Sequence, residues 1–501
     1  MAVTLIPFPQ SLQPPLPTIE GHVDYRQLRQ ELLRLDELLS QSQLEAQFIS
    51  RALEQWLKEP RFAKKPPSAK AQLHFQIHSR RALRCNVLRT YLKEDFRGFA
   101  ARLADSPLFQ HFCGLSQLDK IVVPAKSTLQ RYAHWIDEPT LHTLNDQALR
   151  HAHDQPKALS LLKPVDLEAC FLDTTCLKAN IHYPVDWVLL RDATRTLMKA
   201  VQLIRDQGLR HRMEEPAVFL TRMNRLCIDM THSSRKMERQ RHRKKVLRQM
   251  DKLVGSVGRH ARRYRQLLAE HWEQTQWTQA QTQQVLRRID GVLEQLPAAR
   301  KQARQRILQE QPVANEDKIL SLYEPDVQVI VRHKAGAEVE FGNSLLLAES
   351  RQGLIMDWEL FKEPAPGDAR LVPPSLERIE KNLQIELKEL GADRGFDSAS
   401  NQQRLAKEQI YNGICPRDPH QLQERLGSWK FVRLQRRRSQ TEGRISIVLH
   451  NFLGCPMRCK GFAHRQLAVG WGVLTHNLWV LARLPKRKAK KKAAPARRQA
   501  A

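Results

Sequence analysis

The sequence predicts an α/β fold, in which a mixed-sheet core is interrupted by a large all-helical insertion and preceded by an all-α domain. Three observations predict it. Apolar residues recur at helical spacing through the first 150 residues. Short apolar runs bounded by turns occur at 169–176 and again at 327–417. Between these runs, residues 187–312 have a helical pattern and are strongly basic.

The composition indicates a folded chain with an anionic partner. Of the 501 residues 41% are hydrophobic, and the formal net charge is +29. Such a charge favours a polyanionic partner, and nucleic acid is the leading candidate. The eight cysteines have no disulfide-framework spacing, and we find neither a signal-peptide pattern nor a spanning apolar run. We therefore expect a cytoplasmic protein.

The N-terminal part predicts an arm and a helical domain. Residues 1–22 are proline-rich and predict a disordered arm, and residues 23–150 predict a helical DNA-binding domain. Its first helix is indicated by leucines on one face, at Leu28, Leu32, Leu35 and Leu39.

A possible helix-turn-helix lies at 105–136. Asp105 or Ser106, with Pro107, predicts the start of a first helix, Gly114 its end, and Ser127 the cap of a second. A plain helical bundle explains this pattern equally well. We hypothesise that Lys126 and Arg131 contact DNA, since the N-terminal residues of a recognition helix meet base edges. Unchanged DNA binding by a Lys126→Ala/Arg131→Ala variant would exclude that role.

The central stretch of the chain is Ala169–Asp186. Its apolar run ends on Asp173, and a carboxylate at the end of a buried strand is costly unless it is paired. The simplest interpretation of Asp173 is a strand-end cap. Asn180, Tyr183 and Asp186 are interpreted as structural residues around this strand.

The helical insertion at 187–312 has a cationic face. Between Arg235 and Arg265 there are thirteen Lys or Arg and two acidic residues, a net charge of +11. An apolar stripe nevertheless runs through this segment, at Val246, Met250, Leu253 and Val257. The pattern predicts an amphipathic helix whose Lys244 and Lys245 can bind phosphates.

The second half returns to strands. We expect strands at 327–331, 338–349, 353–360 and 409–417, a helix after Pro373 and Pro374, and a last apolar helix at 465–484. Asp393 lies between a short strand and a glycine turn, and Glu442 in the first turn of a helix within 436–454. The basic tail 485–501 predicts disorder.

The order of the predicted elements places three carboxylates in one candidate site. A β-hairpin with Asp173 on its first strand, two more strands, a helix, a strand ending at Asp393, a helix, a strand and a helix bearing Glu442 is the order of an RNase H-like fold. Two carboxylates about 4 Å apart repel by roughly 1 kcal/mol in water and about 4 kcal/mol at an effective dielectric of 20. Such a cluster predicts two bound Mg²⁺ or Mn²⁺ ions, which can activate a water or a 3′-hydroxyl against a phosphodiester.

The chain resembles bacterial insertion-sequence transposases of the DDE class, in the branch with a helical N-terminal domain and an RNase H-like core. The matching stretches are LFQHFCGLSQLDKIVVPAKSTLQRY, DTTCLKANIHYPVD, VEFGNSLLLAES with GLI, ADRGFDS and RRRSQTEGRIS. The resemblance implies a catalytic core at 160–484, binding of terminal inverted repeats, metal-dependent strand cleavage and strand transfer into target DNA. It also implies a homodimer or larger assembly on DNA, associated with the nucleoid.

Carried over by position, Asp173, Asp393 and Glu442 match the family's catalytic, metal-binding carboxylates. Arg438 matches the arginine of the family signature Tyr-x2-Arg-x3-Glu-x6-Lys.

The chain departs from this signature twice. Gln435 stands in place of the tyrosine and Leu449 in place of the lysine, and His450 follows immediately. Either His450 or a nearby lysine could take over contact with the DNA end.

Rival interpretations stay open. Asp357, on a predicted strand, competes with Asp393, and Asp397 reads as a turn or cap residue. Cys455, Cys459 and His464 could bind a metal, although buried thiols explain one CxxxC pair better. An RNase H-like nuclease without strand transfer and a non-catalytic DNA-binding descendant of a transposase are the alternative functions.

Overall fold

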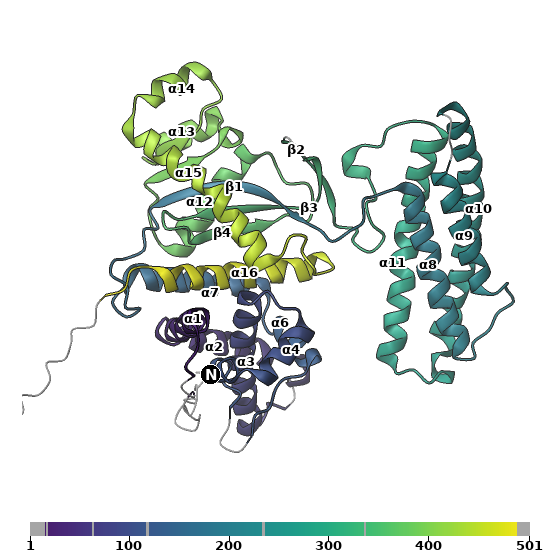
Figure 1. Ribbon diagram of the computed structural model, residues 1–501, viewed down its shortest axis with the longest axis horizontal. Helices are drawn as coiled ribbons and strands as arrows, with labels where there is room; N and C mark the ends of the chain where they lie inside the picture. The colour runs from purple at the N-terminus through teal and green to yellow at the C-terminus, as the bar shows by residue number, and fades with distance from the viewer. Residues whose placement is uncertain are drawn as a thin grey trace, which may run out of the picture.

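The computed structural model describes residues 16, 19–62, 65–116, 120–232, 236–334 and 337–487. A six-stranded mixed sheet lies at the centre of the molecule, the N-terminal helices lie against one side of it, and a bundle of long helices stands apart (Figure 1). The architecture is therefore mixed α/β, as the sequence predicts.

Seven helices build the N-terminal part and its junction with the sheet. They bury the predicted leucine stripe, with Leu32, Leu35 and Leu39 at most 1% exposed and Leu28 partly buried. Their bounds are α1 Val23–Gln41, α2 Leu44–Leu57, α3 Ala69–Tyr91, α4 Phe96–Asp105, α5 Pro107–Phe112, α6 Lys126–Ala133 and α7 Glu138–Asp154, with the short 3₁₀ helix η2 Pro60–Phe62.

The predicted helix-turn-helix differs from the structure at its turn. Ser106 caps α5 and Gly114 has φ +63°, as expected, but the second helix starts at Lys126 with Ala125 as its cap, so Ser127 lies inside it. Residues 113–125 separate the two helices, whereas a helix-turn-helix uses a turn of three or four residues. A bridge between Ser116 and Ile121 makes this connection a small loop of its own, of which residues 117–119 lie outside the described residues.

The sheet places the Asp173 strand at its centre. Its strands are β1 Ala169–Lys178, β2 Gln328–Lys334, β3 Ala337–Glu349, β4 Ile355–Leu360, β5 Glu389–Ala392 and β6 Tyr411–Ile414. The order is β2-β3-β1-β5-β6, and β4 also pairs with β3. β1 is antiparallel to β3 and parallel to β5, and β5 is parallel to β6.

All predicted strands are present, but the expected hairpin after Asp173 is wrong. Residues 179–185 leave the sheet and lead into helix α8, so β1 pairs instead with β3, with Asp173 opposite Leu347. Sheet pairing across the insertion is non-local, and the local pattern around Asp173 does not encode it.

The remaining core helices are α12 Asp368–Leu383, α13 Ala399–Lys407, α14 Pro419–Leu426, α15 Trp429–Ile447 and α16 Phe462–Arg483, with η5 Asn315–Asp317, η6 Arg394–Phe396 and η7 Val448–Leu453 between elements. Two predicted starts are wrong. α12 begins before Pro373 and Pro374, because Asp368 suits the positive end of the helix dipole. α15 begins where Ser428 caps it, so Glu442 lies well inside the helix and not in its first turn.

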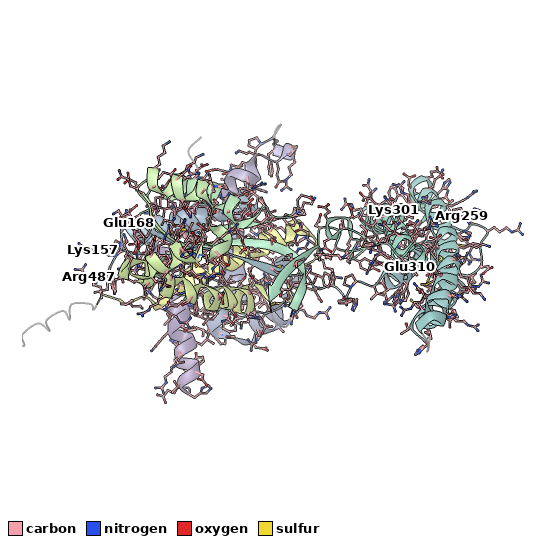
Figure 2. The ribbon with its side chains drawn as sticks, turned by 90° about the horizontal axis from the view of Figure 1, so that it is seen from above. Lys157, Glu168, Arg259, Lys301, Glu310 and Arg487 are labelled. Atoms are coloured by element: carbon pink, nitrogen blue, oxygen red, sulfur yellow. The ribbon has the colours of Figure 1, made fainter. Side chains whose placement is uncertain are left out.

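The insertion is a four-helix bundle with a hydrophobic core of its own. Its helices are α8 Asp186–Asp206, α9 Pro216–Thr231, α10 Lys236–His271 and α11 Gln279–Ala303, followed by η4 Arg304–Leu308; η3 Trp272–Gln274 joins α10 to α11. The α10 stripe is buried at Val246, Met250 and Val257, and Leu253 is partly buried. Seen from above, Lys301 and Glu310 lie on this separate body, far from Lys157 and Arg487 at the other end (Figure 2).

The predicted arm and tail fall largely outside the described residues, which exclude 1–15, 17–18 and 488–501. Of the described residues of these segments, Leu16 lies against the core and Lys486 forms a β-bridge with Leu161, whereas Ile19 is 43% exposed. Within the described ranges no helix is both long enough and apolar enough to cross a membrane.

Candidate active site

Three carboxylates that lie far apart in the sequence line one cleft of about 500 Å³. Asp173 comes from β1, Asp393 from the end of β5 and Glu442 from α15. The rest of the lining comes from both sheet and helices: Thr174, Thr175, Ile330, Val331, Ser344, Ala365, Pro366, Asp368, Arg438, Ile445, Ser446, Leu449 and His450. The three residues that the sequence singled out are thus together in the structure.

Strand register brings the two aspartates together. β1 and β5 are parallel, with Cys170 opposite Leu390 and Phe171 opposite Gly391. Continuing this register puts Asp173 beside Asp393, on neighbouring strands whose spacing is about 4.8 Å. The two carboxylates therefore lie at the same level of the sheet.

The alternation of side chains along β1 turns Asp173 toward α15. Phe171 packs on Leu434 of α15, and Leu177 packs near Ile445 farther along the same helix. Asp173 lies two residues from Phe171 and four from Leu177, so its side chain is on the same face of β1 as theirs. It therefore faces the part of α15 between Leu434 and Ile445. That part carries Arg438 and Glu442.

A buried ion pair fixes α15 on the sheet. Arg437 Nη1 lies 2.8 Å from Glu349 Oε1, and its Nε and Nη2 donate to the carbonyl oxygens of Arg351 and Ser350. Thr441 also donates to Glu349, at 2.7 Å. Because Arg437 and Thr441 flank Arg438 on the helix, these contacts set the position of the cationic side of the cleft.

Arg438 lies between two of the carboxylates without binding either tightly. Its Nη2 is 3.4 Å from Asp393 Oδ2 and 3.8 Å from Glu442 Oε1. Its Nε is buried and has no hydrogen-bond partner among the described residues. The guanidinium therefore keeps donors for an anionic group that enters the cleft.

The cleft raises the pKa of Asp173 to about 6. Burial is the largest cause and the negative charge of Asp393 adds to it, whereas Arg438 and the Thr174 amide, 2.8 Å from Asp173 Oδ1, oppose it. Glu442, whose side chain is 62% exposed, adds a smaller repulsion. A cation bound between these groups would relieve this repulsion.

A fourth carboxylate, Asp368, was missed by the sequence analysis. It is the first residue of α12 and accepts a hydrogen bond of 3.0 Å from Thr174 Oγ1, beside Asp173. A Cβ on Gly395 would meet Asp368 Oδ2 at 2.6 Å and Asp393 Oδ1 at 3.0 Å, so glycine lets the two carboxylates approach. No local motif marks Asp368, and the sequence pattern predicted the start of the helix only after Pro373 and Pro374, which left Asp368 outside it.

The residues that depart from the family signature have distinct places. Gln435 donates to the carbonyl oxygens of Ala392 and Gly413, and so ties α15 to the ends of β5 and β6. Leu449 is 9% exposed and belongs to the apolar core at the edge of the cleft. His450 is exposed and lines the cleft, so it is the polar residue at this end.

The rival acids have structural roles. Asp357 is 3% exposed and accepts hydrogen bonds from Ser375 and from both Nε and Nη2 of Arg378, away from the cleft. Asp397 accepts from Gln402 and from the Arg417 amide. Asp186 pairs with Gln302 and Arg306, so it fixes α8 to the end of α11 and does not orient the β1 strand.

Cys455 and Cys459 are free thiols, and His464 contacts His134 by a ring-edge stack at 4.7 Å. Burial raises the pKa of Cys459. Both thiols are only partly buried, so the structure does not show the fully buried thiols that the interpretation expected.

The other predicted DNA-binding residues lie outside the cleft. Lys126 and Arg131 are exposed on one helix, and Arg131 hydrogen-bonds Thr128 at 3.1 Å. On the bundle, Lys244 forms an ion pair with Glu310, whereas Lys245 is exposed. Lys244 is thus partly neutralised.

The donor set fits a hard divalent cation by its chemistry, since its oxygens all come from carboxylates. Asp173, Asp393 and Glu442 are the residues that would hold Mg²⁺ or Mn²⁺. In the described ranges no three His, Cys, Asp or Glu side chains are close enough to form a ready-made metal site, and Arg438 lies between Asp393 and Glu442.

Comparisons with known proteins give no further assignment. No protein-family model, curated protein or solved structure matches the chain. The functional interpretation therefore depends on the geometry of the cleft and on the sequence motifs.

Proposed function

We propose that the protein is a DDE-class DNA transposase that binds the terminal inverted repeats of an insertion sequence, cleaves the strand there and transfers it to target DNA. The observation that carries this proposal is the convergence of Asp173, Asp393 and Glu442 on one cleft with Arg438 between them. These residues come from a central strand, its parallel neighbour and a helix crossing both.

The sheet supports an RNase H-like core. The order β4-β3-β1-β5-β6, with β1 antiparallel to β3 and parallel to β5, is the order of that fold, and β2 is an added strand on β3. The four-helix insertion then interrupts the core between β1 and β2.

The chain's own residues have defined parts in this chemistry. Asp173, Asp393 and Glu442 would hold two Mg²⁺ or Mn²⁺ ions, whose contribution when bound is to activate the attacking oxygen and stabilise the leaving oxygen. Arg438 lines the cleft, and its guanidinium can make a charge-assisted contact with a phosphate oxygen there. His450 lies at the rim, where it can contact the DNA end.

The net charge of +29 supports a DNA substrate. Lys126 and Arg131 on α6, and Lys245 on α10, are exposed cations that could hold phosphates outside the cleft. A homodimer or larger assembly on DNA is part of this proposal.

The test is incubation of the purified protein with a labelled duplex ending in the inverted repeat beside its gene, plus supercoiled target, with Mg²⁺, Mn²⁺ or EDTA. We expect metal-dependent cleavage at the repeat boundary and joined products. Asp173→Ala and Asp393→Ala should abolish both, because each removes a metal ligand. Glu424→Gln, an exposed carboxylate on α14 outside the cleft, is the matched control and should retain activity.

Two other outcomes contradict the proposal. Cleavage without joined products, under conditions that favour strand transfer, would indicate a nuclease. Full binding of the DNA without metal-dependent cleavage would indicate a non-catalytic DNA-binding protein.

A further inference from the structure

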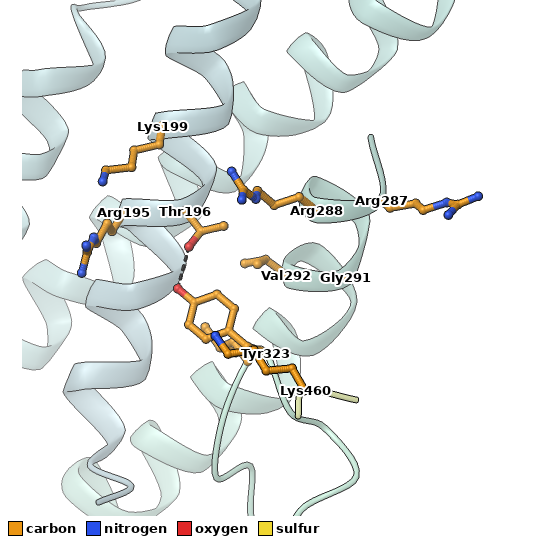
Figure 3. A pocket seen from close by; sticks show the side chains of 10 residues that line it. Arg195, Thr196, Lys199, Arg287, Arg288, Gly291, Val292, Tyr323 and Lys460 are labelled. Atoms are coloured by element: carbon orange, nitrogen blue, oxygen red, sulfur yellow. Dashed lines mark hydrogen bonds between the residues drawn. The ribbon is translucent and has the colours of Figure 1, made fainter. Parts of the chain in front are cut away.

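A second cavity lies where the bundle meets the core. It has a volume of about 580 Å³ and opens between α8 and α11, with Tyr323 and Lys460 at its base (Figure 3). We call it the α8/α11 pocket. Its lining residues are Arg195, Thr196, Lys199, Arg287, Arg288, Gly291, Val292, Leu322, Tyr323 and Lys460.

Half of this lining is cationic and none of it is acidic. Its basic residues are Arg195, Lys199, Arg287, Arg288 and Lys460. Within the described part of the chain, none of the five has a carboxylate within 4.0 Å. No acid of the lining balances these charges, so an anion can bind the cations that face the pocket, such as Arg288, which reaches toward α8, whereas Arg287 points away (Figure 3).

Some arginines of the bundle are paired with acids, whereas others, such as Arg248, Arg259 and Arg263, have no carboxylate within 4.0 Å among the described residues. Arg205 pairs with Glu215, Arg265 with Asp290, and Arg300 with Asp251. These acids of the bundle pair with arginines outside the pocket. The cations of the α8/α11 pocket are therefore not neutralised by the described residues.

Tyr323 gives the pocket a fixed flat wall. Its hydroxyl lies 2.6 Å from Thr196 Oγ1 and donates to the Asp192 carbonyl oxygen at 3.2 Å. Figure 3 shows Arg288 reaching from α11 toward α8 on one side of this ring, and Lys460 on the other side. The ring is part of a residue that is 45% exposed, so a bound molecule can reach it.

The pocket continues toward the core. An adjoining groove shares Arg195, Tyr323 and Lys460 with it and adds Tyr183, which is 77% exposed. The groove also contains two acids, Asp192 and Glu324, which pair with Arg191 and Arg465. Its other cations lie beside exposed aromatic rings, an arrangement that can bind a nucleic-acid strand, since phosphates pair with cations and sugars or bases lie on the rings.

The segment that carries Lys460 is joined to the catalytic strand. The Met457 amide donates to the Lys178 carbonyl oxygen at 2.9 Å, at the end of β1. Lys178 lies five residues beyond Asp173 on β1, which is about 17 Å at roughly 3.3 Å per residue. The groove begins two residues farther along, at Asn180, so it lies past the end of the strand that carries Asp173.

We propose that the α8/α11 pocket binds the phosphodiester backbone of DNA that is engaged in the cleft. This makes the α8–α11 side a DNA-binding face of the insertion, in addition to the exposed Lys245 on α10. The inference rests on the proposed function for the identity of the DNA, but the binding itself requires no cleavage.

Gly291 offers a clean test. It is exposed in α11, and a Cβ placed there meets nothing within 4 Å. Gly291→Glu adds a carboxylate among the cations, and glutamate forms helix better than glycine, so the fold is retained. Gly291→Gln has nearly the same shape without the charge and is the matched control.

The measurement is binding of a fluorescent duplex of the inverted repeat by the full chain in EDTA, over a range of salt concentrations. We expect Gly291→Glu to weaken binding about tenfold or more and to lower the slope of log affinity against log salt by about 1 to 2, since each lost phosphate contact removes about 0.9. Gly291→Gln should bind like the wild type. Equal binding by all three proteins, or equal weakening by both variants, would overturn the proposal.

The two proposals fail in different ways. If the protein never cleaves DNA but Gly291→Glu alone loses affinity, the pocket inference stands and the proposed function fails. If cleavage and joining occur and Gly291→Glu binds normally, the reverse holds. Competition by inorganic phosphate as efficient as by duplex, per phosphate, would also overturn it and indicate a small-anion site.

Discussion

Asp173 is the residue whose ionisation the cleft alters most clearly. Its pKa is raised to about 6 because burial and the charge of Asp393 both disfavour the carboxylate. A raised acid pKa means that the folded state holds a proton that the unfolded chain has already lost. Its effect on stability is therefore a penalty that develops as the pH rises from about 4 to about 6 and persists above that range.

Asp173→Asn should stabilise the protein at neutral pH. The gain should be up to about 3 kcal/mol in the free energy of unfolding, since one pKa unit corresponds to about 1.4 kcal/mol, and it should vanish near pH 4. Urea unfolding across this pH range measures it. A gain that does not change with pH would contradict electrostatic repulsion as the cause.

Divalent metal provides the control at the same residue. Mg²⁺ or Mn²⁺ should raise the Tm of the wild type, because a ligand that binds only the folded state stabilises it. It should raise the Tm of Asp173→Asn much less.

At the scale of elements, the orientation of α15 depends on one buried ion pair. Arg437 and Glu349 are 9% and 6% exposed, and the guanidinium also lies over the Phe171 ring at 4.5 Å. A buried pair costs little to replace as a whole but leaves a buried charge when one partner is removed.

Arg437→Met should therefore destabilise the protein by about 3–5 kcal/mol. The Arg437→Met/Glu349→Leu double variant should recover a large part of that loss, because no buried charge remains. Denaturant unfolding of the four members of this cycle measures the coupling. Additive losses would show that the pair does not act as a unit.

At the scale of the whole molecule, two hydrophobic cores are separate. The core under the sheet joins the N-terminal helices, α12 and α16, with Leu172 at its centre. The bundle core joins α8 to α11 around Leu197, and the two cores share no residue. Separate cores predict separate cooperative units.

Leu197→Ala should lower the transition of the bundle alone, by about 2–5 kcal/mol, because it leaves a cavity in that core. Leu172→Ala should lower the other transition. Differential scanning calorimetry resolves the two transitions. A single transition that moves equally in both variants would contradict independent cores.

The sequence alone determined the local elements of this protein. The strand that contains Asp173, the strand that ends directly before Asp393, the α10 stripe at Val246 and Met250, and the last apolar helix are all set by side-chain periodicity, which acts over a few residues. The element order also placed the acids correctly on strands and a helix. Local patterns did not predict where helices start. Glu442, for example, was predicted in the first turn of a helix, but that helix begins much earlier, at the cap residue Ser428.

Only the tertiary structure decided which charges meet. The parallel register of β1 and β5 selects Asp393 over Asp357, which is held by Arg378 instead. The folding of α12 brings Asp368 to the same cleft, and the packing of α8 on α11 leaves the cations of the α8/α11 pocket without acids. These outcomes depend on contacts between residues far apart in the chain, and local side-chain patterns do not encode such contacts.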